Sequence, residues 1–173
     1  PPSPEEVDEF VRSKDLRAYE KLIDRLLASP RYGERWGRHW LDVARYAESS
    51  GKQANMSYPH AWRYRDYVIS SMQADKPFDQ FIREQLAGDL LPARDDQQKA
   101  EQLIATGFLA IGSKNHNERR PHQFLLDLID EQIDTTTTAF LATTVSCARC
   151  HDHKFDPIST KDYYALAGIF RST

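Results

Sequence analysis

Apolar residues recur every three or four positions along most of this chain, and that spacing places them on one face of an α-helix. Prolines, glycines and short polar stretches interrupt the pattern at intervals, and each interruption predicts the end of a helix. The pattern predicts helices over residues 15–29, 31–49, 61–75, 78–91, 99–112, 122–146 and 160–172. No convincing alternation of apolar and polar residues predicts a β-strand, so we expect an all-α fold with about six to seven helices.

Two details of these helices can be predicted more closely. Residues 135–138 are four consecutive threonines, and their β-branched side chains favour strand over helix. We therefore expect a break in the helix over 122–146 at this point. Thr160 is expected to cap the last helix, with Asp162 in its first turn.

The length of 173 residues suits one domain with a buried core. We expect a single mainly helical domain over residues 15–173, and a linker or domain boundary over residues 1–14, because the two opening prolines are typical of the end of a linker. No apolar run approaches the roughly 18–20 residues that a membrane-spanning helix needs. The first residues also lack the basic start and apolar stretch of a signal peptide.

Composition and charge narrow the class of protein. Hydrophobic residues make up 40% of the chain, which is typical of a folding sequence rather than a disordered one. The net charge is −3, with acidic and basic residues interleaved. This balance gives no broad positive face and argues against nucleic acid or an anionic membrane as the main partner.

The candidate chemistry is concentrated in SCARCHDHKF, residues 146–155, which holds both cysteines of the chain. Cys147, Cys150 and His151 form a C-x-x-C-H motif. In c-type haem attachment, two such thiols bond to the two vinyl groups of the porphyrin and the adjacent histidine coordinates the iron. We predict one covalently attached haem near the C-terminal helix, bound by Cys147 and Cys150, with His151 as the proximal iron ligand.

Three other readings of the motif remain open. A structural zinc site needs four ligands, and only the two cysteines with His151 or His153 lie close together in the sequence. A thioredoxin-like redox pair is expected after a strand, which the pattern does not predict. A plain disulfide between Cys147 and Cys150 is the simplest alternative.

A second axial ligand for the iron has to come from upstream or from His153. Met56 and His60 lie in or beside the polar loop over residues 50–60, and Met72 lies on the apolar face of a predicted helix. Core packing is the ordinary role of a methionine such as Met72, and His60 is equally explained as a polar residue at a helix start. Cytochromes of the c-prime type, which are four-helix bundles, also carry the motif near the C-terminus and often leave the iron five-coordinate.

Several long stretches together resemble a known family. The chain resembles the planctomycete cytochrome-like domain family of unknown function from about Asp15 to Thr173, through RYGERWGRHWLDVARYAES, WRYRDYVI, DKPFDQFIREQLAGDLLP, ATGFLAIG and CARCHDHKFDPISTKDYYALAGIFRST. The resemblance implies haem at Cys147, Cys150 and His151, and a place in large exported proteins, after a small cytochrome c domain and before another domain of unknown function. It implies no catalytic residues.

Three functions follow as expectations. The first is electron transfer by the covalent haem, with a neighbouring haem or redox domain of the same polypeptide or complex as partner, in the periplasm or another extracytoplasmic compartment. The second is a haem enzyme or small-ligand-binding domain with an open iron, its pocket lined by aromatic residues. The third is a partner- or glycan-binding module in which haem is structural or absent. The aromatic candidates for the pocket are Trp36, Trp40, Trp62, Tyr64 and Tyr67.

Overall fold

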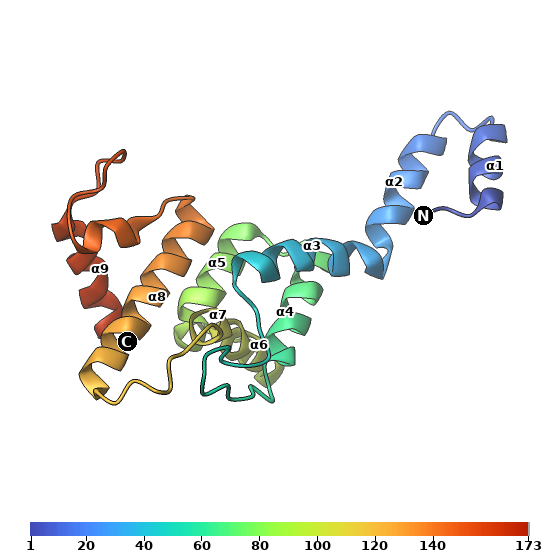
Figure 1. Ribbon diagram of the computed structural model, residues 1–173. Coiled ribbons are helices and arrows are strands. Elements are labelled where there is room, and N and C mark those ends of the chain that lie inside the picture. Colours follow the sequence, from blue (N-terminus) through green and yellow to red (C-terminus); the bar gives the residue numbers. More distant parts are fainter. Residues whose placement is uncertain (173) are drawn as a thin grey trace.

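The computed structural model describes residues 1–172, and within that range regular structure is helical except for an isolated antiparallel bridge between Ser49 and Ser57. The all-α prediction is confirmed. Figure 1 shows an elongated molecule with α1 and α2 at one end, α3 to α7 in the middle, and α8 and α9 at the other end. They are α1 (Pro4–Arg12), α2 (Ala18–Ala28), α3 (Pro30–Val43), α4 (Trp62–Gln73), α5 (Phe78–Ala87), α6 (Asp96–Ala105), α7 (Gly107–Ala110), α8 (Pro121–Leu141) and α9 (Thr160–Arg171), with 3₁₀-helices η1 (Gly88–Leu90) and η2 (Val145–Arg149).

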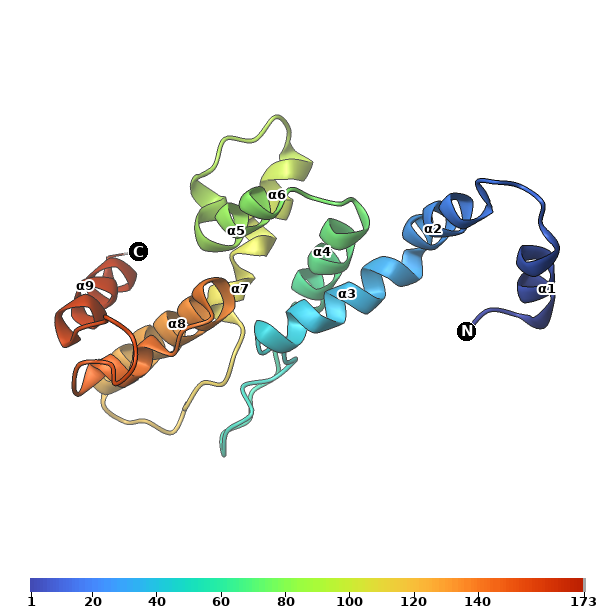
Figure 2. The same cartoon turned by 90° about the horizontal axis from the view of Figure 1, so that it is seen from above.

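The segment over residues 1–14, predicted as a linker or domain boundary, contains helix α1. Ser3 and Glu6 form a capping box at its start, and Pro4 occupies the first helical position, where a missing N–H costs nothing. Helices α1 and α2 bury no residue, and an ion pair of 2.8 Å between Arg25 and Glu6 joins them. Figures 1 and 2 both show this pair projecting away from the remaining helices.

The predicted helix boundaries shift where the chain offers local signals. Ser29 ends α2 and caps α3, so that Pro30 begins the next helix. Helix α3 ends at Val43, earlier than predicted, because the backbone turns at Arg45 with a positive φ of 54°. The predicted helix over 99–112 is divided into α6 and α7 at Thr106.

The predicted break at the threonines does not occur, and α8 is continuous from Pro121 to Leu141. The hydroxyl groups of Thr135 and Thr137 donate to the carbonyl oxygens of Glu131 and Ile133, four residues earlier, at 2.8 and 2.9 Å. These bonds satisfy the buried hydroxyls inside a helix, which removes the cost of burying them. The predicted cap of α9 is one residue off, since Ser159 caps the helix in a box with Asp162.

Two separate cores hold the helices together. The first core lies among α3 to α7, and Trp40 donates its indole N–H there to Tyr64 and Gln85 at 3.0 Å each. The second core lies among α8, η2 and α9. The first core consists of Trp40, Leu41, Ala44, Tyr64, Tyr67, Val68, Phe81, Ala105, Phe108 and Ile111, and the second of Ile129, Ile133, Val145, Ala148 and Tyr163.

Glycines allow α3 and α4 to approach closely. A Cβ atom on Gly33 would lie 2.7 Å from the backbone oxygen of Ile69, and one on Gly37 would lie 3.0 Å from the side chain of Ile69. The two glycines are one helical turn apart, so they form a flat strip on α3 against which α4 packs. This contact sets the geometry of the first core.

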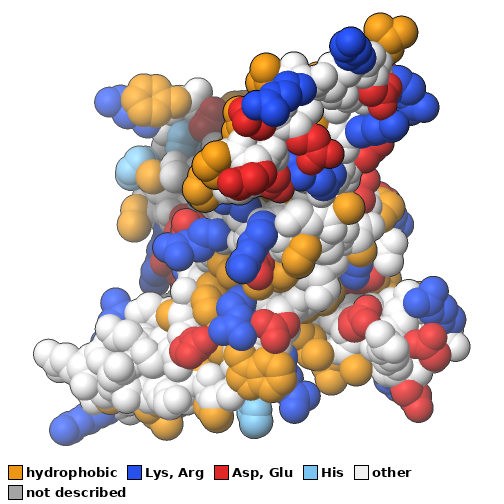
Figure 3. Space-filling model, turned by 90° about the vertical axis from the view of Figure 1, so that its right-hand side faces the viewer, with side chains coloured by type: hydrophobic (Ala, Val, Ile, Leu, Met, Phe, Trp, Pro, Cys, Tyr) orange, Lys and Arg blue, Asp and Glu red, His pale blue; other side chains and the backbone are white. Residues whose placement is uncertain are grey.

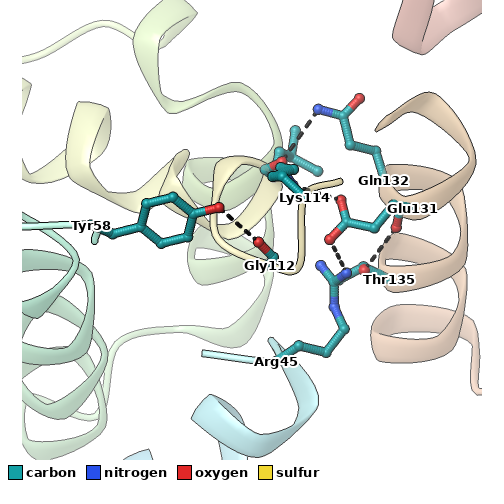
Figure 4. A network of polar contacts seen from close by, with 8 residues as sticks. Arg45, Tyr58, Gly112, Lys114, Glu131, Gln132 and Thr135 are labelled. Carbon is teal, nitrogen blue, oxygen red and sulfur yellow. Dashed lines mark hydrogen bonds and ion pairs between the residues drawn. The ribbon is translucent and has the colours of Figure 1, made fainter. Parts of the chain in front are cut away.

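The first half of the molecule is built around the first core and the second half around the second core. Helix α8 connects the two halves through its length and also through a polar network. Figure 4 shows the carboxylate of Glu131 between Arg45, at the end of α3, and Lys114, in the loop before α8. Lys114 lies 3.0 Å from Glu131, and Tyr58 donates to the carbonyl oxygen of Gly112 at 3.0 Å. The network therefore joins α3, two loops and α8.

The surface carries charges of both signs. Figure 3, which faces the side of the molecule with α1 and α2, shows acidic and basic side chains interspersed with apolar ones. Across residues 1–172, the helices are too short or too polar to cross a lipid bilayer.

Candidate functional site

The C-x-x-C-H motif lies in the second half of the molecule, on η2 and the turn that follows it. Cys147 is in η2, Cys150 ends it, and both cysteines are free and exposed. His151 follows in a bend and is also exposed. The motif thus lies between α8 and α9, at the end of the molecule opposite α1 (Figure 1).

The 3₁₀ geometry divides residues 145–150 into three faces, because residues three apart are eclipsed in such a helix. Val145 and Ala148 form the face that is buried in the second core. The second face, Ser146 and Arg149, is turned to α8. Cys147 and Cys150 share the third face, and it is open to solvent.

Acidic residues of α8 fix the polar face of this turn. Ser146 donates to Asp134 at 3.0 Å, and Arg149 pairs with Asp130 at 2.9 Å. Asp130 also accepts from the hydroxyl of Tyr163, on α9. These bonds tie α8, η2 and α9 together, so the direction of the cysteine face is set by the fold.

The carboxylate of Asp130 and partial burial change the pKa values of its two partners, Arg149 and Tyr163. Burial acts against the charged form of Arg149, but the carboxylate of Asp130 outweighs it and keeps the pKa of Arg149 above its usual range. Burial, together with the hydrogen bond to Asp130, raises the pKa of the Tyr163 hydroxyl. Both groups are therefore held in their protonated forms around one carboxylate.

The two histidines of the motif region differ in which ring nitrogen is free. The Nδ1 atom of His151 lies 2.8 Å from the carbonyl oxygen of Asp152, so it donates there and leaves the Nε2 lone pair available. In His153, Nδ1 accepts the backbone N–H of Asp156 at 2.9 Å, which leaves the proton of the neutral ring on Nε2. The exposed His151 is the histidine whose bonding suits an iron ligand.

A zinc site and a c-type haem require different arrangements of the motif residues. Among residues 1–172, no three His, Cys, Asp or Glu side chains converge as ligands of one metal ion. Zinc requires such convergence. In a c-type haem, by contrast, the thiols bond to two separate vinyl groups and the histidine alone coordinates the iron. A thioredoxin-like context is also lacking, because the motif follows α8 rather than a strand.

Of the candidate distal ligands, Met56, His60 and Met72 lie in the other half of the molecule, and His153 lies beside the motif. Met72 packs against the first core. Met56 is exposed in the 50–60 loop, where its N–H donates to Ser50, and His60 is exposed just before α4. Figures 1 and 2 both show α4 and this loop on the opposite side of α8 from η2 and α9. The structure therefore does not bring Met56, His60 or Met72 to the motif.

The aromatic residues considered as pocket walls are also elsewhere. Trp40, Tyr64 and Tyr67 are buried in the first core, and Trp36 and Trp62 are exposed on α3 and α4. The residues that do surround the motif, Asp130 and Tyr163 among them, were not predicted. The sequence VSCARC, residues 145–150, does contain a signal for this arrangement. At a spacing of three residues it repeats an apolar residue, a polar residue and a cysteine.

Comparisons with known proteins identify the family. The searches of curated proteins and of solved structures find no match. The model of one protein family, described as "PSCyt2: Protein of unknown function (DUF1549)", matches residues 1–173. Since the match spans the full length of the chain, this chain belongs to the PSCyt2 family, a planctomycete domain family of unknown function.

Proposed function

We propose that this chain is a c-type haem domain, in which Cys147 and Cys150 bind one haem covalently, His151 coordinates the iron, and the haem transfers electrons within a larger exported protein. The observation that carries the proposal is the shared solvent face of the two thiols on η2, next to an exposed imidazole with a free Nε2. Two thiols on one face can reach one macrocycle without any change in the core.

Attachment of the haem to the two cysteines requires no oxidant. Each thiol adds across one vinyl double bond: a carbon–sulfur bond forms, the π bond breaks, and the thiol hydrogen goes to the other vinyl carbon. When bound, the haem supplies one-electron chemistry at its iron. The chain contributes the two anchors and an imidazole oriented by the Asp152 carbonyl group. Because haem is joined to such motifs outside the cytoplasm, the proposal includes an extracytoplasmic location.

The second candidate is a small-ligand-binding or enzymatic haem with an open iron. It is favoured by the position of Met56, His60 and Met72 in the other half of the molecule. The two candidates differ in the spectrum that they predict. Electron transfer predicts low-spin bands, and an open iron predicts high-spin bands that shift when carbon monoxide or cyanide is added.

The test is expression in bacteria with an export signal and the haem c maturation machinery, followed by denaturing intact mass and optical spectra. We expect the mass of one haem in the wild type, and at most one thioether link in Cys147→Ala or Cys150→Ala. His151→Ala should keep both links and change the spectrum. His39→Asn, on the exposed surface of α3, is the matched control and should leave the spectrum unchanged. Absence of haem mass, or unaltered spectra in all variants, would refute the proposal.

A further inference from the structure

Helix α9 is apolar on two opposite sides. Its inner side packs in the second core through Tyr163, with Leu166, Ala167 and Phe170 partly buried behind it. Its outer side also carries apolar residues, and these are exposed. We call this the outer face of α9; it consists of Tyr164, Ala165, Gly168 and Ile169.

The apolar face of a helix is normally buried against another surface. Helices of soluble proteins usually bury one apolar stripe and turn polar residues to the solvent, and a helix that is apolar all round is buried. Tyr164 is 58% exposed and Ile169 is 60% exposed. The outer face of α9 thus leaves apolar side chains uncovered beyond the charged Lys161 at the start of the helix.

This face begins at the C-x-x-C turn. The hydroxyl of Tyr164 donates to the carbonyl oxygen of Arg149, between the two cysteines, at 3.2 Å. The ring of Tyr164 also packs edge-on against Tyr163, with centroids 5.2 Å apart and an interplanar angle of 85°. Tyr164 is therefore held beside the turn that carries the thiols.

The shape and charge of the outer face suit a flat apolar plate with an anionic edge. Among residues 1–172, and apart from its chain neighbours and the backbone of its own helix, no atom lies within 4 Å of the point where a Cβ would stand on Gly168. Lys161 is exposed and lies one turn before Tyr164 and Ala165 on the same side of the helix. A haem has this form, with an apolar macrocycle and two propionates at one edge.

We infer that the haem attached at Cys147 and Cys150 lies against the outer face of α9, so that Tyr164 and Ile169 cover one side of the macrocycle. This inference rests on the proposed haem attachment. The thioether links restrict the haem to the neighbourhood of η2, and the outer face is an apolar surface that contacts η2 through Tyr164. Covering it removes apolar area from water on both the haem and the helix.

Radiolytic hydroxyl-radical footprinting with mass spectrometry tests this inference. The haem-bearing protein is compared with the double variant Cys147→Ser/Cys150→Ser, whose substitutions are at exposed positions. We expect oxidation of Tyr164 and Ile169 to be several-fold slower in the haem-bearing protein. Tyr19 and Ile23 on α2, which are 67% and 38% exposed, are the matched controls and should react equally in both.

A pair of variants gives a second readout. Ile169→Asp should keep the haem mass but make bleaching of the haem by hydrogen peroxide several-fold faster, and Ile23→Asp should leave the rate unchanged. Equal oxidation of Tyr164 and Ile169 in haem-bearing and haem-free protein, with the haem mass present, would overturn this inference alone. A protein that gains no haem would overturn the proposed function and this inference together.

Discussion

The carboxylate of Glu84 is 1% exposed in the first core, where Tyr67, Lys76 and Gln80 donate to it. Burial favours its neutral form, but these donors outweigh burial and lower the pKa of Glu84 below its usual 4.5. A carboxylate with a lowered pKa adds stability above its unfolded pKa, and this stability is lost as the pH falls through the folded pKa. Glu84 should therefore contribute to acid unfolding below about pH 4.5.

The prediction is that Glu84→Gln lowers the free energy of unfolding at pH 7 and makes its decline below about pH 4.5 shallower. Urea unfolding followed by circular dichroism from pH 7 to pH 3 measures both effects. Glu9→Gln, on the exposed surface of α1, is the control. An acid decline of the same slope in wild type and Glu84→Gln would show that this carboxylate is not a source of pH dependence.

At the scale of single residues, the sequence shows which residues form the motif but not how they are oriented. The spacing of Cys147, Cys150 and His151 is visible in the sequence. The difference between His151 and His153 is not, because it depends on which backbone group meets each Nδ1 atom. The link from Arg149 to Asp130 joins residues 19 positions apart and needs the fold to bring them together.

At the scale of elements, two glycines in helices should respond in opposite directions to the same change. Gly33→Ala places a Cβ 2.7 Å from the backbone oxygen of Ile69, so we expect a loss of about 1–3 kcal/mol in the free energy of unfolding. Gly168→Ala meets no atom within 4 Å and removes the entropy cost of glycine, so we expect a gain of about 0.5–1 kcal/mol in the haem-free protein.

Urea unfolding at pH 7 measures both variants against wild type. Because each change adds the same methyl group to a helix, the difference between them isolates the close approach of α3 and α4. Two shifts of the same sign would contradict the packing described here.

Helical periodicity predicts most of the elements because most helices bury one face, and α2 shows the same pattern although it buries no residue. Periodicity alone gives a wrong prediction where a local side-chain hydrogen bond stabilises a helix. The hydroxyls of Thr135 and Thr137 bond to carbonyl oxygens four residues earlier, so the helix accommodates two of the four threonines through their own hydroxyl groups. Helix α1 buries no residue and was missed as a helix, although Ser3 and Glu6 carry the sequence signal of a capping box.

At the scale of the whole molecule, the sequence predicts one domain but not its two cores. Helix α8 contributes Ile129 and Ile133 to the second core, while Ala139 and Phe140 pack against the first. Apolar periodicity does not say which neighbour a helix face meets, so neither the separation of the cores nor the distance of Met72 from the motif was visible in advance.

The network around Glu131 should decide whether the two halves unfold together. Glu131 pairs with Arg45 and Lys114, and two other nitrogens of Arg45, Nε and Nη2, are buried without a partner. Glu131→Gln leaves two cations near each other without their shared carboxylate, and we expect a loss of roughly 1–3 kcal/mol in the free energy of unfolding. Because Glu131 of α8 pairs with Arg45 and Lys114, this loss weakens the contact between the two halves.

Two probes can separate the halves in thermal unfolding. Tryptophan fluorescence reports the first half, because Trp36, Trp40 and Trp62 all lie on α3 and α4, whereas hydrogen exchange of α9 reports the second. We expect coincident transitions in the wild type and separate ones in Glu131→Gln, with Asp79→Asn, which removes an exposed ion pair on α5, as the control. Coincident transitions at an unchanged midpoint in Glu131→Gln would mean that packing along α8 couples the cores without the network.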